Sequence, residues 1–287
     1  MHEEDEAMSY KTVLVSLNEA GRLAEAIAAA VVVARATDAH VSGLYVIPSV
    51  QVYPSVGFEA APQVFEGNRT FFKDNAARVK KTFEDAMARE GLPYDFHLID
   101  GHTPLIADEV IAAARSTDVI VVSATNPDEI TGVERDFVEQ VVMAAGRPVI
   151  VLPAKGSAVL SFTDVVLGWD GGREAARAAF DSVPLLRLAA KVRIVRVDPQ
   201  KDPALRGSVA GADLAEALAR HGVKATVQSY ASDGMDEGQA LMRCADDNGA
   251  GLIVMGAYGH SRLAEFIFGG ATRFVLTRMT KPVLMSH

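Results

Sequence analysis

Cysteine is almost absent from this chain of 287 residues, in which Cys244 is the only example. A single cysteine excludes an intrachain disulfide framework and fits a reducing compartment such as the cytosol. Cys244 shares a helical face with Ala240 and Leu241, so we expect its thiol to lie in the core.

Basic runs and long apolar runs are also missing. The net charge is −9 and no Lys/Arg cluster occurs, which argues against a nucleic-acid partner. No apolar run approaches the roughly 20 residues of a membrane span. Four of the first six residues are acidic, so this segment cannot form the basic start of a secretory signal. We therefore expect a cytoplasmic protein with no nucleic-acid or membrane partner.

Common catalytic signatures are missing too. The chain contains no G-x-x-x-x-G-K-[ST] phosphate loop and no G-x-S-x-G nucleophile turn with triad partners. His97, His102 and His221 show no metal-ligand spacing with cysteine or carboxylates. The sequence therefore predicts neither a metal site nor a dedicated enzyme.

Short β-branched and apolar runs alternate with helical segments along the whole chain. This alternation is typical of parallel sheets flanked by helices, an α/β fold. The predicted strands cover residues 11–17, 40–47, 94–99, 118–123, 148–152, 164–169, 191–197, 223–230, 252–255 and 282–286.

The order of elements runs twice, which predicts two copies of one domain. The first strand of each copy and the closing Pro-Val strand of each copy match by pattern. We place the domains at residues 1–156 and 157–287. The first copy is longer because of a proline-rich stretch, which we interpret as a long loop over residues 48–70.

Glycines cluster after the fourth strand of the second copy. Gly256 and Gly259 follow this strand directly, and Gly269 and Gly270 begin a predicted helix. Glycine lets backbone approach a ligand closely, and free N–H groups at a helix start attract anions. The stretch therefore predicts an anion cradle beyond the carboxyl ends of the strands, where ligands bind in open parallel sheets.

The spacing of these glycines resembles the signature of the universal stress protein family, G-x2-G-x9-G-(S/T). Asp170-Gly171-Gly172 after the first strand and the closing Pro-Val-Leu-Met strand add to the resemblance. The resemblance implies two tandem doubly wound five-stranded parallel sheets of order 3-2-1-4-5. It also implies binding of ATP or another adenine nucleotide, alone or with Mg²⁺.

By the same resemblance, Asp170 and Val197 hold the adenosine end. The residues implied for ribose and phosphates, with the strand residue before them, are Met255, Gly256, Gly259, His260, Gly269, Gly270, Ala271 and Thr272. One position departs from the pattern, because Gly270 stands where the family has Ser or Thr. Thr272 offers a hydroxyl two residues later.

The first copy lacks this cradle. Its matching segment, residues 123–129, has no glycine pair, contains Pro127 and is followed by further acidic residues that would repel phosphate. Leu17 is taken as the counterpart of Asp170. We expect no nucleotide in the N-terminal half, and we infer that the fold itself does not require the glycines of the second half.

The leading hypothesis is a stress-response protein that uses a bound nucleotide for a regulatory or protective role without being an enzyme. One alternative is a slow ATPase or autophosphorylating protein using Thr272 or Ser261. Another is a protein-interaction module with an empty site, an option that Gly270 keeps open. The protein partner is not identifiable from the sequence. The closing strands are expected to pair within one chain as a pseudo-dimer, and a homodimer stays open.

Overall fold

The structure is a computed structural model that describes residues 9–49, 61–126, 128, 131–198, 211–259 and 270–287, without the side chains of residues 61–66 and 68. Ten strands in these ranges form one sheet. They are β1 (Thr12–Ser16), β2 (His40–Ile47), β3 (Tyr94–Asp100), β4 (Val119–Ser123), β5 (Val149–Leu152), β6 (Asp164–Gly168), β7 (Lys191–Val197), β8 (Ala225–Tyr230), β9 (Leu252–Gly256) and β10 (Val283–Ser286).

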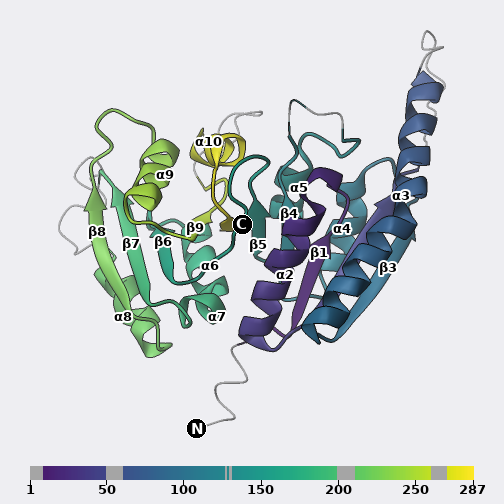
Figure 1. The fold of residues 1–287 in the computed structure, drawn as a ribbon. Helices are drawn as coiled ribbons and strands as arrows, with labels where there is room; N and C mark the ends of the chain where they lie inside the picture. The colour runs from purple at the N-terminus through teal and green to yellow at the C-terminus, as the bar shows by residue number, and fades with distance from the viewer. Residues whose placement is uncertain (1–8, 50–60, 127, 129–130, 199–210, 260–269) are drawn as a thin grey trace.

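The sheet runs in the order β3-β2-β1-β4-β5-β10-β9-β6-β7-β8. Each half has the predicted doubly wound order, and its strands pair in parallel. The two predicted five-stranded sheets are parts of one ten-stranded sheet, because the closing strands β5 and β10 pair within the chain, as expected, with Val151 opposite Val283 and Val149 opposite Met285 in an antiparallel register. The two closing strands thus join the halves into one continuous sheet, seen at the centre of Figure 1.

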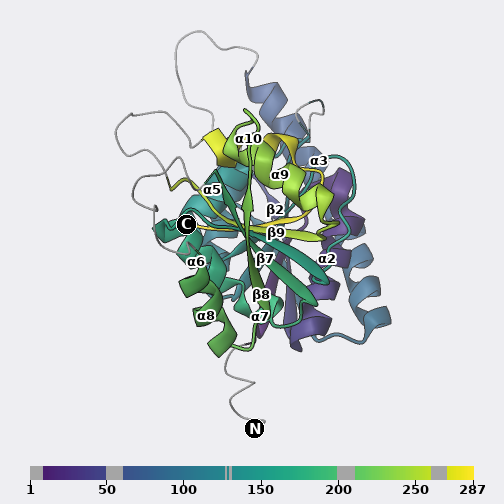
Figure 2. The same ribbon diagram turned by 90° about the vertical axis from the view of Figure 1, so that its left-hand side faces the viewer.

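Helices cover both faces of the sheet (Figures 1 and 2). Helix α2 packs beside α3 and α4 beside α5, while in the second half α6 packs beside α7 and α9 beside α10. The helices are α2 (Leu23–Thr37), which follows the short 3₁₀ helix η1 (Ala20–Arg22), α3 (Ala61–Glu90), α4 (Ile106–Ala114), α5 (Phe137–Ala144), α6 (Arg173–Asp181), α7 (Val183–Leu186), α8 (Ala212–Arg220), α9 (Glu237–Asp247) and α10 (Gly270–Arg278).

Helix α3 corrects the expected 48–70 loop. It begins at Ala61, so residues 61–69 are helical, while residues 50–60 lie outside the described ranges. Pro62 stands in the first turn, where a missing N–H costs no intrahelical hydrogen bond. The prolines of this stretch therefore do not prevent α3 from beginning as early as residue 61.

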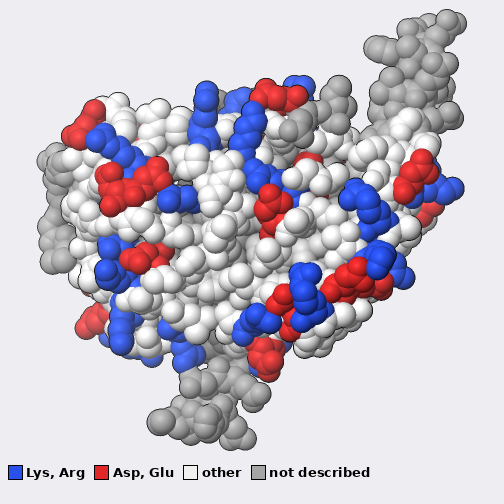
Figure 3. All heavy atoms as spheres, viewed as in Figure 1, with Lys and Arg blue, Asp and Glu red and all other residues white. Residues whose placement is uncertain are grey.

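The core follows from the parallel pairing. All five residues of β4 are buried, as expected for a strand covered on both faces. The outermost strands β3 and β8 are far more exposed. On the face of the molecule shown in Figure 3, Lys and Arg side chains are interspersed with Asp and Glu side chains. None of the described helices combines the length and apolarity of a membrane span.

Candidate functional site

The predicted site residues of the second half that the structure describes lie at one edge of the sheet. Strands β6, β7 and β9 are parallel neighbours, so their carboxyl ends meet at the same edge. Asp170 follows β6, Val197 ends β7 and Gly256 ends β9. Helix α10 begins beside them, at Gly270.

His260 and Gly269, together with the alternative nucleophile Ser261, lie outside the described residues. Met255 is 6% exposed and its side chain belongs to the core, so only its backbone could serve a ligand. Gly270 is exposed, and an added Cβ there would meet nothing within 4 Å. Ala271 is half-buried in the first turn of α10.

Asp170 is exposed and folds its carboxylate back onto the chain. Its Oδ1 accepts a hydrogen bond from Gly172 N at 2.7 Å, an Asx turn that leads into α6. Gly171 has a φ of 78°, which suits glycine. Val197 is half-buried and stands opposite Tyr230 of β8.

Gly256 is required by packing. A Cβ on Gly256 would lie 2.4 Å from Ala175 N and 2.5 Å from Glu174 C, because the first turn of α6 lies directly on the end of β9. The inference that the fold does not require the glycines of this cradle is therefore wrong for Gly256.

Thr272 connects the glycine turn to helix α10. Its Oγ1 accepts a hydrogen bond from Tyr258 N at 3.0 Å, and the residue is 4% exposed. Tyr258 has a φ of 60°, a strained value for a bulky residue, which the bond from Thr272 helps to hold. The Thr272 hydroxyl therefore has a structural partner and little access to a ligand.

Glu174 is a site neighbour that the sequence reasoning missed. A Cβ on Gly259 would lie 2.9 Å from Glu174 Oε2, so a carboxylate already stands against the predicted phosphate cradle. Glu174 is 6% exposed and paired with Arg173. Burial alone would raise its pKa, but hydrogen bonds from Arg173 and its own backbone N–H, together with the charges of Arg173 and His287, lower the pKa below its ordinary value.

The same edge of the first half is organised differently. Leu17 N bonds Leu44 O as Trp169 N bonds Val195 O, so Leu17 matches Trp169, and Asn18 rather than Leu17 is the counterpart of Asp170. Asn18 is 2% exposed.

The amide of Asn18 closes this edge. Its Nδ2 donates to Val46 O at 2.7 Å, and Val46 N donates to its Oδ1 at 3.0 Å. Val46 is the counterpart of Val197 in the aligned registers. The first half therefore satisfies with its own amide the backbone groups that correspond to the predicted adenosine end.

In the first half, Glu134 occupies the start of helix α4. Its Oε1 accepts the N–H of Ile106, and its carboxylate also receives the N–H of Ala107. These are orphan donors at the start of α4. Burial raises the pKa of Glu134, against the effect of these hydrogen bonds. A side-chain carboxylate thus occupies a helix start that could otherwise attract an anion.

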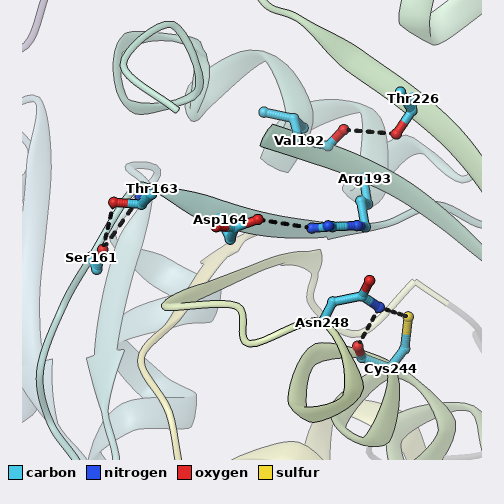
Figure 4. A network of polar contacts seen from close by, with 8 residues as sticks. All are labelled: Ser161, Thr163, Asp164, Val192, Arg193, Thr226, Cys244 and Asn248. Carbon is cyan, nitrogen blue, oxygen red and sulfur yellow. Dashed lines mark hydrogen bonds and ion pairs between the residues drawn. The ribbon is translucent and has the colours of Figure 1, made fainter. Parts of the chain in front are cut away.

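Cys244 lies away from this edge, in the network of Figure 4, where Asn248 Nδ2 donates to its carbonyl oxygen and lies 3.5 Å from its sulfur. The thiol is buried, and burial raises its pKa above the ordinary value. The location agrees with the expected core thiol. Among the described residues, no group of three or more His, Cys, Asp or Glu side chains could hold a metal ion.

Comparison with known proteins relates part of the chain to a protein family. Residues 161–287 match the sequence model of the universal stress protein family. A curated relative, universal stress protein Slr1230 of Synechocystis, is 26% identical over 148 residues, and the alignment covers 51% of this chain and 49% of that protein. The match therefore spans about half the length of the curated relative.

Solved structures share the fold of the whole chain. A universal stress protein from Archaeoglobus fulgidus has a TM-score of 0.67 at 16% identity, over 96% of this chain and 97% of that one. Another universal stress protein of that organism, solved in complex with dAMP, covers 50% of this chain and 98% of its own, at 16% identity and a TM-score of 0.35. The family match thus covers residues 161–287 and makes this part of the chain similar to a universal stress protein domain.

Proposed function

We propose that the second half binds an adenine nucleotide at the edge formed by the ends of β6, β7 and β9. The observation that carries this proposal is the bond from Tyr258 N to Thr272 Oγ1. It holds the Gly256–Gly259 turn against the start of α10, at the edge where Asp170 and Val197 also lie.

The residues fit the adenosine end better than the phosphate end. Asp170 carries an exposed carboxylate that can accept hydrogen bonds from a ribose or base. Backbone N–H groups of Gly270 and Ala271 at the start of α10 can receive a phosphate, with His260 and Gly269 predicted to add to them. Glu174 opposes that phosphate by its charge, so AMP should bind better than ATP unless Mg²⁺ offsets the repulsion.

The cellular role we propose is that of a cytoplasmic stress-response module that binds nucleotide without turning it over. Regulation follows if the nucleotide binds one conformation of the protein more tightly than another and so changes the surface offered to a protein partner. The antiparallel β5–β10 pair supports the intrachain pseudo-dimer that this proposal includes.

The enzyme alternative is weaker because of Thr272. A nucleophile must reach the phosphate that it attacks, yet this hydroxyl is 4% exposed and accepts from Tyr258 N. The alternative of a protein-interaction module with an empty site is favoured by two observations. Glu174 stands beside Gly259, and Gly270 lacks the hydroxyl that the family pattern supplies.

Calorimetric titration of AMP, ADP and ATP, each with and without Mg²⁺, tests the proposal. Gly259→Asp places a second carboxylate beside Glu174 and should abolish binding, whereas Gly270→Ala, which enters open space, should preserve it. Circular dichroism and urea unfolding establish that both variants fold. Absence of binding in the wild type would reject the proposal, and phosphate release lost in Thr272→Ala would favour the enzyme alternative.

A further inference from the structure

Arg196 is a buried arginine in β7, one residue before Val197 of the candidate nucleotide site. The residue is 4% exposed and stands opposite Ser229 of β8. Strand alternation places it on the same face of the sheet as Ile194 and on the opposite face from Arg193.

One nitrogen of the Arg196 guanidinium lacks the partner that a buried charged group needs. Its Nη1 is buried and has no hydrogen-bond partner. Asp198, the nearest carboxylate along the chain, accepts instead from the backbone N and the hydroxyl of Ser232. An arginine stays charged at every pH at which proteins fold, so an unpaired guanidinium in this position is strongly unfavourable.

Arg193 of the same strand shows the usual arrangement. Its Nη1 lies 3.1 Å from Asp164 Oδ1 on β6, a pair drawn in Figure 4. The two arginines therefore differ in one respect that matters here, because the chain supplies a carboxylate to Arg193 and none to Arg196 among the described residues.

Helix α8 begins over the same face. Its N-cap Gly211 lies against Ile194 and Val227, since a Cβ there would be 3.4 Å from Ile194 Cγ2 and 3.2 Å from Val227 Cγ1. The first N–H groups and the positive dipole end of α8 therefore lie on the side of the sheet from which Arg196 extends. Asp213, the acidic residue of this first turn, is exposed to solvent.

The first half shows that the fold does not require a charge at this position. Tyr45 is the counterpart of Arg196 in the aligned registers. Its hydroxyl donates to Phe72 O of α3 at 3.0 Å, so a neutral group with an internal acceptor fills the place.

We propose that Arg196 and the first turn of α8 form a binding site for an oxyanion, most naturally the phosphate group of a small molecule. The planar fork of a guanidinium matches two oxygens of a phosphate, and a helix start adds backbone donors. The two sites share no residue, so this proposal does not depend on the proposed nucleotide site.

Thermal unfolding in inorganic phosphate tests the proposal, with sodium chloride at equal ionic strength as the reference for general salt effects. The wild type should show a phosphate-specific rise in Tm on the order of 5 °C when phosphate reaches 100 times its Kd, growing with the logarithm of the phosphate concentration. Arg196→Met should lose this phosphate-specific rise, and Arg193→Met, the matched control from the same strand, should keep it. Equal phosphate responses in the wild type and Arg196→Met would overturn the proposal.

Two further arms sharpen the result. Acetate in place of phosphate distinguishes a phosphate group from a carboxylate: a response to phosphate alone supports the first, a response to both supports a general oxyanion site, and a response to neither overturns it. If Arg196→Met does not fold, NMR of the arginine side-chain nitrogens in the wild type gives the answer. A phosphate-dependent shift of the Arg196 signal supports the site, and an unmoved signal contradicts it.

Discussion

In both halves of the sheet the carboxyl ends of the strands meet in the same geometry. The polar groups at this edge, however, are bonded in opposite ways in the two halves. In the first half, Asn18 uses both atoms of its amide to bond Val46 O and Val46 N. In the second half, the matching Asp170 is exposed, and it bonds Gly172 N. A carboxylate cannot donate to a carbonyl, so Asp170 cannot close the edge as Asn18 does.

This difference teaches that the same strand order can carry an edge that is closed by its own side chains or one that leaves a polar side chain exposed. The first half satisfies its edge internally, and Glu134 caps helix α4 with a second internal group. The second half retains an exposed carboxylate, a glycine turn and a helix start. It also places the Glu174 carboxylate against that turn. This carboxylate disfavours ligands with a large negative charge.

The largest effect is expected from Gly256→Ala. The new Cβ would lie 2.4 Å from Ala175 N, and backbone atoms of α6 cannot move as a side-chain end can. We expect a loss of about 3 kcal/mol in the free energy of unfolding, the upper range for overpacking, measured by urea denaturation. Gly270→Ala is the control and should be close to neutral. A Gly256→Ala protein as stable as the wild type would show that packing does not fix this glycine.

Exchanging the side chains of the two edges should have unequal effects. Asn18→Asp removes the donor to Val46 O and buries a carboxylate, so we expect a loss of about 2–3 kcal/mol. Asp170→Asn at an exposed position should change stability by less than about 0.5 kcal/mol. Similar losses in both variants, by denaturation, would refute the description of a closed edge and an open edge.

Glu174→Gln tests the charge beside Gly259. Removing the carboxylate should strengthen ATP binding relative to AMP binding by about tenfold, because the repulsion falls on the phosphates. The ratio of the two Kd values from calorimetry measures this effect. A ratio unchanged from the wild type, with binding intact, would show that Glu174 does not act on the phosphates.

The same carboxylate predicts a pH effect on stability. Since its folded pKa is lowered from the ordinary value of 4.5, ionised Glu174 contributes stability that is complete above that value. This contribution is lost as the pH falls through the lowered folded pKa. Urea midpoints between pH 7 and pH 3 should therefore fall less steeply in Glu174→Gln than in the wild type, and parallel curves would contradict the cited shift.

A modest effect is expected from Thr272→Val, which removes the acceptor of Tyr258 N. Val138 precedes β5 by the same number of residues as Thr272 precedes β10, so the first half already has valine at this place. We expect a loss of about 1 kcal/mol by urea denaturation, the usual net value of one hydrogen bond. Thr272→Ser should restore most of this loss. If the free energy of unfolding of Thr272→Val equals that of the wild type, the Thr272 hydroxyl is not needed for stability and is available to a ligand.

Much of the fold was predictable because local pattern and topology agree. The buried apolar runs, the helix at Gly270 and the strand order 3-2-1-4-5 all follow from the sequence and the family resemblance. The pairing of β5 with β10 was expected from the family resemblance, but its consequence, one continuous sheet, was described as two five-stranded sheets. The first turns of helix α3 were predicted as part of a loop because they contain Pro62, although proline is tolerated in a first helical turn.

The candidate site was predictable in its location and less so in its chemistry. Asn18 was missed because pattern matching aligned Leu17 with Asp170, and only the strand registers correct this by one residue. Glu174 was missed because it occurs among ordinary helix residues, and its proximity to Gly259 is a tertiary contact. The dual demand on Gly256, from packing as well as from a ligand, also needs the structure.

The number of nucleotides bound per chain tests the central comparison most directly. Isothermal titration of AMP into the wild-type protein should give one site per chain, which Gly259→Asp abolishes and Asn18→Ala leaves in place. Two sites per chain would contradict the closed edge of the first half, and no binding at all would contradict the proposed role of the second.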